Sequence, residues 1–194
     1  MRRIEIPVLI VGAGPVGQMA VRWARCAGLA SITVVDLSEL RLRLAERGGA
    51  TDYHLGGLAD LHGALLDASQ GEGFELVVDT TGNPAVFAAA LSIAAPFGKV
   101  VLLGDTGYPS RQALSSDMMT KGLTIVATHD HHDRGGWTQR RIDQLFFKLA
   151  HDGRFTLDGL ITHEFVPRDC EAAYALVSDH REEAVGVLFD WTQV

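Results

Sequence analysis

The chain has 194 residues, enough for one large domain or one domain with a small appendage, and too few for two full-sized domains. Hydrophobic residues make up 47% of the chain and charged residues 21%, a composition that excludes a globally disordered protein. The formal net charge of −7, with no block of Lys and Arg, argues against nucleic acid as a partner.

Apolar runs are short and cysteines are few. The run from Pro7 to Val11 is far below the ~20 residues that a membrane span needs, and no small-residue cleavage site follows it. We therefore expect an unprocessed chain with no membrane partner. Cys26 and Cys170 are too few for a disulfide framework or a cysteine-based zinc site, so a reducing, cytoplasmic setting is the default expectation.

Short β-branched runs alternate with longer helical patterns up to about His129, which predicts βαβ units and a parallel sheet. Most of the runs lack polar alternation, as is typical of strands covered by helices on both faces. The predicted strands are Val8 to Val11, Ile32 to Val35, a weak strand near Tyr53, Glu75 to Asp79, Val100 to Gly104 and Leu123 to Thr128. The predicted helices are Pro15 to Cys26, Ser38 to Arg47 with Ser38 as N-cap and Gly48 as C-cap, Leu58 to Ser69, and Pro84 to Ala95.

The pattern changes after Thr128. A polar stretch from His129 to Gly136 precedes an amphipathic helix around Thr138 to Ala150. A strand, a helix and a strand are predicted next, at Ile161 to Val166, Cys170 to Val177 and Val185 to Trp191. The predicted fold is thus α/β, with a doubly wound, parallel, six-stranded sheet over residues 1–135 and an appended C-terminal α+β segment over residues 136–194.

The strongest functional signal is an apolar strand that leads directly into Gly12-Ala13-Gly14-Pro15-Val16-Gly17 and then into a helix. In this pattern Gly12 permits a tight turn, Gly14 lets the backbone approach a diphosphate, and Gly17 lets the helix pack against the strand. The second apolar strand ends at Asp36, about 20 residues further on, where a carboxylate accepts hydrogen bonds from both ribose hydroxyls. These features predict a dinucleotide site. The alternatives are a turn and packing contact without ligand, with Asp36 as a solvated acid, or a sheet that holds S-adenosylmethionine or a flavin.

Asp36 favours NAD over NADP, because its carboxylate repels a 2′-phosphate and no Arg follows it directly. Arg41, five residues on, either contacts the adenosine ribose or 2′-phosphate, or is an exposed helix residue. A ligand in such a sheet lies across the carboxyl ends of the strands. That rule adds further expected contacts at Thr80, Thr81, Gly82, Leu103, Gly104, Asp105, Thr128 and His129, although ordinary turn chemistry accounts equally well for Gly82 and Gly104.

Several stretches of the chain resemble one known protein family. They are VLIVGAGPVGQMAVRWARCAG, ITVVDLSELRLRLAERGGA, FELVVDTTGNPAVFAAAL, GKVVLLGDTG, and ITHEFVPRDCEAAYALV followed by VGVLFDW. Together they resemble the coenzyme-binding half and the C-terminal return segment of the zinc-type medium-chain alcohol dehydrogenase superfamily. The resemblance implies a Rossmann fold and an NAD(P)-linked oxidoreductase that acts on an alcohol, polyol or aldehyde. It also implies cofactor positions at Gly12, Gly14, Val16, Gly17, Asp36, Arg41, Thr81, Leu103 and Gly104.

Complete members of that superfamily begin with a catalytic half that supplies the zinc ligands and most of the substrate pocket. Nothing in this sequence corresponds to that half, so we expect no zinc in this chain, and its catalytic residues are unknown. The dense stretch His129-Asp130-His131-His132-Asp133 fits no established closed metal site and is interpreted as a solvated loop. We predict NAD(H) binding with little activity alone. The alternatives are a standalone NAD(H)-binding or redox-sensing module, and a non-redox enzyme that reuses the pocket.

The resemblance also implies partners: a separate catalytic half and a second copy of the chain. The segment Gln112 to Ser116, next to the sixth predicted strand, resembles the dimerisation edge of the superfamily, so we expect a homodimer. In the superfamily the tail packs against the catalytic half. We therefore expect an apolar, partly exposed surface in this chain, formed by Phe165, Val166, Val187, Phe189 and Trp191.

Overall fold

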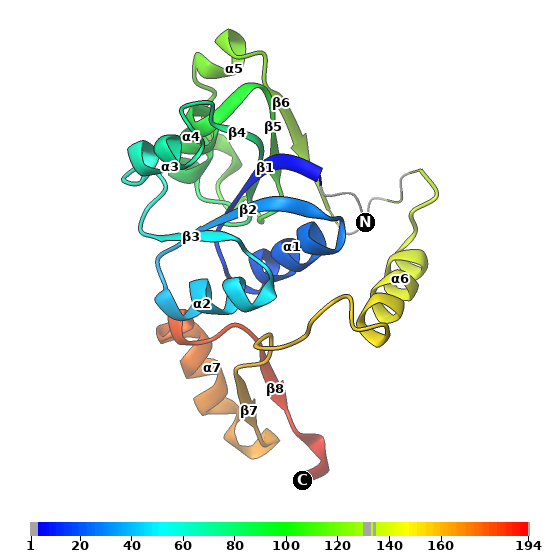
Figure 1. The fold of residues 1–194 in the computed structure, drawn as a ribbon. Coiled ribbons are helices and arrows are strands. Elements are labelled where there is room, and N and C mark those ends of the chain that lie inside the picture. Colours follow the sequence, from blue (N-terminus) through cyan, green and yellow to red (C-terminus); the bar gives the residue numbers. More distant parts are fainter. Residues whose placement is uncertain (1–3, 130–132, 134, 194) are drawn as a thin grey trace.

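The computed structural model describes residues 4–129, 133 and 135–193. A six-stranded sheet in the order β3-β2-β1-β4-β5-β6 forms its centre, and every neighbouring pair of strands is parallel. Helices cover both faces of this sheet (Figure 1). The strands are β1 (Ile4–Val11), β2 (Leu29–Asp36), β3 (Asp52–Leu55), β4 (Phe74–Asp79), β5 (Ala94–Leu102) and β6 (Thr124–Ala127). The predicted doubly wound α/β fold is confirmed.

The two faces of β1 supply two separate cores. Ile10 belongs to a buried cluster with Val21 of helix α1 (Pro15–Cys26), whereas its neighbour Leu9 belongs to a cluster with Phe87 of helix α4 (Pro84–Ile93). Successive side chains of a strand point to opposite faces, so both faces of this central strand are buried. This double burial explains why the strand reads as an unbroken apolar run in the sequence.

The helices of the sheet region are α1 (Pro15–Cys26), α2 (Glu39–Gly48), α3 (His62–Ala68), α4 (Pro84–Ile93) and the short α5 (Asp117–Thr120). Helices α1, α2 and α4 begin within one residue of the predicted start, whereas α3 begins later, and the ends of α2 and α4 differ from the prediction. The C-cap of α2 is Gly49 and not the predicted Gly48, because Gly49 has the left-handed φ of +111° while Gly48 is still helical. Helix α4 stops before the predicted Ala95, because Ala94 already pairs with Phe74 in the sheet.

The predicted start of α3 and the predicted end of β5 were also wrong, each for a local reason. Helix α3 begins four residues after the predicted Leu58, because residues 58–61 form a turn that has the buried Leu58 at its start. Strand β5 ends at Leu102 and not at Gly104. The backbone N–H groups of Leu103 and Gly104 both donate to the Asp79 carbonyl at 2.9 Å, which takes the chain out of the ladder with β6.

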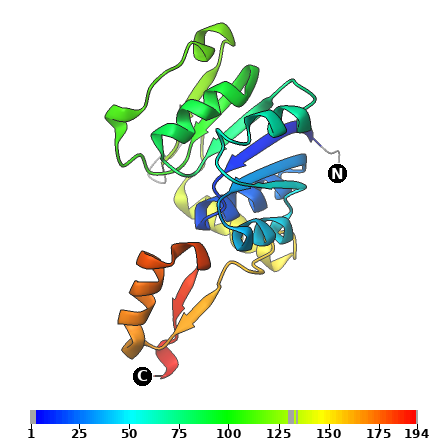
Figure 2. The ribbon, with the colours of Figure 1, turned by 90° about the vertical axis from the view of Figure 1, so that its left-hand side faces the viewer.

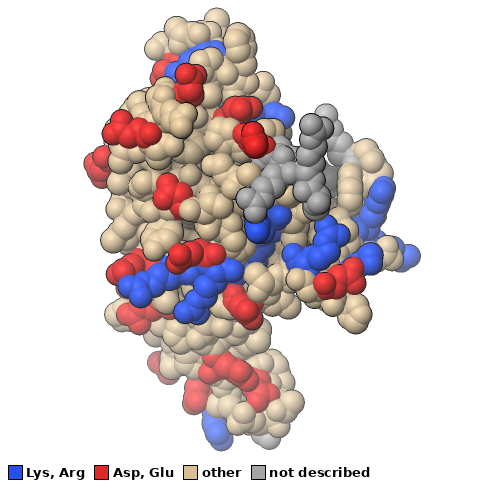
Figure 3. Space-filling view, in the orientation of Figure 1, with Lys and Arg blue, Asp and Glu red and all other residues tan. Residues whose placement is uncertain are grey.

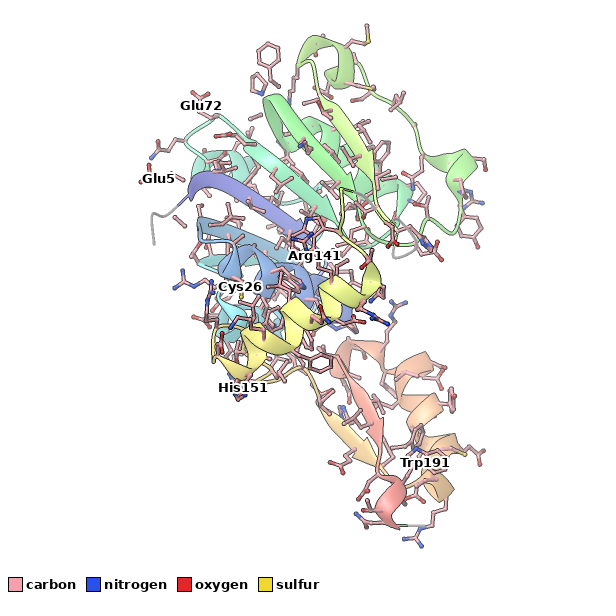
Figure 4. All side chains as sticks on the ribbon, turned by 90° about the vertical axis from the view of Figure 1, so that its right-hand side faces the viewer. Glu5, Cys26, Glu72, Arg141, His151 and Trp191 are labelled. Atoms are coloured by element: carbon pink, nitrogen blue, oxygen red, sulfur yellow. The ribbon has the colours of Figure 1, made fainter. Side chains whose placement is uncertain are left out.

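The last part of the chain, residues 163–193, projects away from the sheet, whereas helix α6 (Gln139–His151) lies beside the sheet region (Figures 1 and 2). The C-terminal part consists of α6, a connector of residues 152–162, and a lobe of residues 163–193 that holds β7 (His163–Phe165), α7 (Cys170–Asp179) and β8 (Val187–Phe189). The predicted order of strand, helix and strand in the appended segment is confirmed, and the structure shows that β7 and β8 form a parallel pair. Both strands are shorter than predicted. Figure 4 shows Trp191 at the far end of this lobe, where its side chain is 70% exposed.

Aromatic contacts attach α6 to the sheet region. The ring of Phe155, in the connector, lies edge-on to Trp23 of α1 and to Phe146 of α6, with 5.2 Å between ring centroids in each pair. Leu149 of α6 is buried as well, whereas Ile142 of the same helix is exposed. Within the described part of the chain, no helix combines the length and the apolar character that crossing a membrane requires.

A buried arginine fixes the connector to α1. Arg22 is 1% exposed, and its guanidinium donates from Nε to the Thr156 carbonyl at 2.9 Å and from Nη2 to the Asp158 carbonyl at 2.6 Å. Its Nη1 donates to Oε1 of Gln18 at 2.8 Å. Burial lowers the pKa of Arg22 from its ordinary value, and the nearby Asp158 charge opposes that shift. Arg22 is therefore the central polar link between the sheet region and the C-terminal part.

We expect Arg22→Ala to lower the free energy of unfolding by about 3 kcal/mol, because it leaves buried carbonyl groups and the Gln18 amide without a donor. Urea unfolding followed by circular dichroism measures this loss. Arg47→Ala is the matched control, since Arg47 is exposed at the end of α2 and its loss should cost no more than about 0.5 kcal/mol. Equal effects of the two substitutions would contradict the role given to Arg22.

Candidate functional site

A cavity of about 790 Å³ opens at the carboxyl ends of β1, β2 and β4, where the strand order of the sheet reverses. Its size is in the range of ligand pockets, and open parallel sheets bind their ligands at this point. Nine predicted site residues line it: Gly12, Gly14, Pro15, Val16, Gly17, Asp36, Arg41, Thr80 and Thr81. The β1–α1 turn, the β2–α2 turn and the segment after β4 thus converge on one space.

The glycine turn, residues 12–17, brings the start of α1 against the end of β1. Gly12 has a φ of +92°, and its N–H donates to the Val35 carbonyl at 2.8 Å. A Cβ at Gly17 would lie 1.9 Å from the Gly12 carbonyl oxygen, so no other residue fits there. Around Gly14, by contrast, the closest atom to such a Cβ is Arg41 Nη1 at 3.9 Å. The turn is therefore packed on its protein side and open on its cavity side, at a helix N-terminus that favours anions.

Asp36 joins the two turns that border the cavity. Its Oδ2 accepts a hydrogen bond from the Ala13 N–H at 2.6 Å, and its Oδ1 accepts one from the Ser38 N–H at 2.8 Å. Each carboxylate oxygen can accept a second hydrogen bond. The carboxylate is therefore held in place by backbone groups and still has acceptor capacity for hydroxyl groups in the cavity.

The segment after β4 forms the opposite wall. Thr80 donates from its hydroxyl to the Val11 carbonyl at 2.9 Å, which ties the end of β4 to the end of β1. Asp79 is 2% exposed, and its Oδ1 accepts hydrogen bonds from the N–H and the hydroxyl of Thr81 at 2.8 and 2.7 Å. Both threonine hydroxyls thus use their proton within the protein, so this wall supplies shape to the cavity and no free hydroxyl donor.

The remaining predicted contacts do not line this cavity. They are Gly82, Leu103, Gly104, Asp105, Thr128 and His129, which follow β4, β5 and β6 at the same edge of the sheet. Their contact with a ligand stays a prediction. Of the predicted solvated stretch at 129–133, residues 130–132 lie outside the described residues.

Arg41 points toward the C-terminal lobe. Its Nη2 donates to the carbonyls of Arg181 and Ala184, the latter at 2.9 Å, while its buried Nε has no partner among the described residues. The Ser38 hydroxyl donates to the Glu182 carbonyl at 2.9 Å. Lys and Arg side chains gather over this junction of α2 and the lobe, with acidic side chains beside them (Figure 3).

The cavity also contains residues that the sequence reasoning missed. Gly56 and Gly57 directly follow β3, so the strand-end rule that selected Thr80 would have found them. Arg181 and Glu182 line the cavity from the short turn η3 (Arg181–Glu183) of the lobe. No local sequence signal marks these two residues, because only the docking of the lobe on α2 brings them to the cavity.

The described residues do not form a zinc site of the kind that the superfamily resemblance implies. Among them, one group of metal-ligating side chains comes together, formed by His180, Glu182 and Glu183 on a single exposed turn. It contains no cysteine. Cys26 donates from Sγ to the Arg154 carbonyl at 3.0 Å, and burial raises the pKa of its thiol, whereas Cys170 is exposed at the start of α7. We therefore derive no catalytic step through zinc from these residues.

The comparisons with known proteins give a single answer. The family model for zinc-binding dehydrogenases matches residues 15–139. L-threonine 3-dehydrogenase of Bacillus velezensis is 32% identical over 171 residues, which is 87% of this chain and 47% of the relative. The enzyme of the same name from Burkholderia cenocepacia is 30% identical over 188 residues, 95% of this chain and 51% of the relative. The chain thus spans about half the length of the curated relatives that it matches, and the resemblance expected from the sequence is confirmed.

Solved structures agree with this result. An alcohol dehydrogenase zinc-binding domain protein of Burkholderia ambifaria superposes with a TM-score of 0.82 at 25% identity, over 96% of this chain and 49% of that protein. A short chain alcohol dehydrogenase of Escherichia coli in complex with NADH has a TM-score of 0.81 at 22% identity, over 97% of this chain and 53% of that one, and shares the fold.

Proposed function

Because the chain belongs to the zinc-binding dehydrogenase family, we propose that it binds NAD(H) as the coenzyme-binding part of an alcohol- or polyol-dehydrogenase-like oxidoreductase. The observation that carries this proposal is the convergence of an open glycine turn and a fixed carboxylate on one cavity. The fold shared with a dehydrogenase solved with NADH supports the same cofactor. The L-threonine 3-dehydrogenases among the relatives support oxidoreductase chemistry.

Each part of the cavity suits one part of a dinucleotide. The start of α1 offers unpaired N–H groups and a partial positive charge to the diphosphate. Asp36 accepts hydrogen bonds from the adenosine ribose hydroxyls, and the segment around Thr80 and Thr81 forms the wall toward the nicotinamide side. When bound, the cofactor supplies a hydride acceptor or donor.

NAD is favoured over NADP by the way in which the β2–α2 turn is held. The Asp36 carboxylate would face a 2′-phosphate directly. Arg41, the nearest cation on the same turn, uses Nη2 to hold two carbonyls of the C-terminal lobe. Nη2 of Arg41 is therefore turned toward the lobe and is not available to neutralise a 2′-phosphate.

Titration with NADH and NADPH, followed by cofactor fluorescence, tests this selectivity. Wild type should prefer NADH, and Asp36→Ala should weaken NADH binding about tenfold and remove the preference, since one lost charge-assisted hydrogen bond is worth about that factor. Asp67→Ala, which removes an exposed acid of α3, should change neither affinity. An Asp36→Ala protein that keeps the preference would contradict the proposal.

Turnover needs groups beyond those that the cavity offers. Hydride transfer requires a substrate held next to the nicotinamide in a pocket closed to water. The described residues supply a cofactor cavity and no zinc site, and the relatives have about twice the matched length. We propose that the 194 residues alone have little dehydrogenase activity and that a catalytic half, as a partner, completes the site.

With L-threonine or simple alcohols and NAD as substrates, the chain should produce NADH no faster than a protein-free control, with or without a chelator. Absorbance at the NADH band follows the reaction. Turnover that rises in proportion to protein concentration would refute this part of the proposal.

The C-terminal lobe suits the partner half. Among residues 4–129, 133 and 135–193, no further strand pairs with either edge of its two-stranded parallel sheet, and such small sheets need further packing for stability. Phe165, Val166, Val187 and Phe189 are half-buried and Trp191 is exposed, so an apolar surface is available for that contact. From the sequence pattern we also propose that the chain divides between residues 135 and 136 into a dinucleotide-binding domain and a C-terminal segment. We propose a cytoplasmic setting because the chain has only two cysteines.

We also propose a homodimer through the segment Gln112 to Ser116. Leu114 in this segment is 63% exposed, which suits an apolar contact with a second copy. Sedimentation at micromolar concentration should give the mass of a dimer, and Leu114→Asp should shift it toward the monomer because a buried charge at an interface is costly. Leu188→Asp, at an exposed position of β8, should leave the mass unchanged. A monomeric wild type would refute the dimer.

A further inference from the structure

Gln18, directly after the glycine turn, is a fully buried polar residue that the proposed cofactor contacts do not use. Its side chain is 0% exposed in the first part of α1. Its Nε2 donates to the Ala13 carbonyl at 3.0 Å and to the Arg41 carbonyl at 2.8 Å. Its Oε1 accepts a hydrogen bond from Arg22 Nη1 at 2.8 Å. Every polar atom of the side chain therefore has a partner inside the protein.

Arg22 decides which way the Gln18 amide faces. A guanidinium has only donors, so the amide oxygen must face Arg22. The two carbonyls on the other side are only acceptors, so the amide nitrogen must face them. A flipped amide would set donor against donor and acceptor against acceptor. Because the connector carbonyls fix the other Arg22 donors, the orientation of Gln18 depends on the docking of the connector.

Gln18 in turn fixes the peptide between Ala13 and Gly14. In a planar trans peptide the C=O and the following N–H point in opposite directions. The Ala13 carbonyl faces inward to Gln18, while Asp36 holds the Ala13 N–H of the preceding peptide. Among the described residues, no acceptor is bonded to the Gly14 N–H, and Gly14 lines the cavity. Pro15 has no N–H to offer, so the direction of the Gly14 N–H matters for an anion at this turn.

We propose that Gln18 is a positioning residue for the diphosphate of the cofactor. With Arg22 holding its amide, Gln18 anchors the Ala13 carbonyl so that the Gly14 N–H is directed into the cavity before the ligand arrives. This inference rests on the proposed NAD(H) function and adds to it a link from the C-terminal connector, through Arg22 and Gln18, to the diphosphate turn. Preorganised donors bind an anion more tightly than donors that must first be reoriented.

A purely structural role for Gln18 makes a different prediction. Loss of a buried hydrogen-bonded side chain would loosen the cavity as a whole and weaken every ligand alike. A role in directing the Gly14 N–H concerns the diphosphate alone. The comparison of ADP with adenosine separates the two, because both carry the ribose that Asp36 would bind and only ADP carries the diphosphate.

The experiment measures the dissociation constants of ADP and adenosine by calorimetry for wild type and Gln18→Met, which keeps the side-chain length and removes the donor. In wild type ADP should bind more tightly than adenosine. In Gln18→Met we expect ADP to bind about tenfold more weakly and adenosine to bind unchanged. Gln144→Met, at an exposed position of α6, is the matched control and should alter neither constant.

A second variant protects the test against misfolding. Gln18→Glu keeps the acceptor for Arg22 as an ion pair but cannot donate to the Ala13 carbonyl, so it should show the same selective loss of ADP affinity. In wild type labelled with 15N, ADP and not adenosine should shift the Gly14 amide resonance strongly. Equal weakening of ADP and adenosine in both variants, or an unmoved Gly14 resonance, would overturn the positioning role. A wild type that binds neither NADH nor ADP would instead overturn the proposed function.

Discussion

The start of α1 lies so close to the end of β1 that only glycine fits at the point of contact. A Cβ at Gly17 would lie 1.9 Å from the Gly12 carbonyl oxygen, far inside any non-bonded distance. This contact determines where the N-terminus of α1 points, and therefore where its unpaired N–H groups meet the cavity. Asp36 and Thr80 are both hydrogen-bonded to the same turn, so the other walls of the cavity are placed relative to it.

Two side chains of different chemical character hold the glycine turn, one at the Ala13 N–H and one at the Ala13 carbonyl. Asp36 is a carboxylate with spare acceptor capacity toward the cavity, whereas Gln18 is buried and fully bonded within the protein. Together they fix the two peptides on either side of Ala13. In the proposed diphosphate site these two side chains hold the turn in place before a ligand binds, which reduces the conformational entropy lost on binding.

The same helices that border the cavity also anchor the C-terminal part. Arg22 of α1 holds the connector, while Arg41 of α2 and Ser38, its N-cap, hold the turn that precedes β8. Helices α1 and α2 therefore determine both the position of the lobe and the shape of the cavity. The curated relatives are about twice the matched length, and this arrangement connects the coenzyme-binding region to the lobe for which we propose a contact with a catalytic half.

The sequence by itself determined the sheet class, the glycine turn and Asp36, because unbroken apolar runs, glycine spacing and the distance from turn to acid are local signals. It also gave the starts of α1 and α4 to the residue. Only the tertiary structure decided which strand ends line the cavity, so that Thr81 does and Leu103 does not. It alone brought Glu182 to the rim and turned Gln18 inward. These contacts join segments far apart in the chain, and they depend on how helices and lobe pack, which no local pattern records.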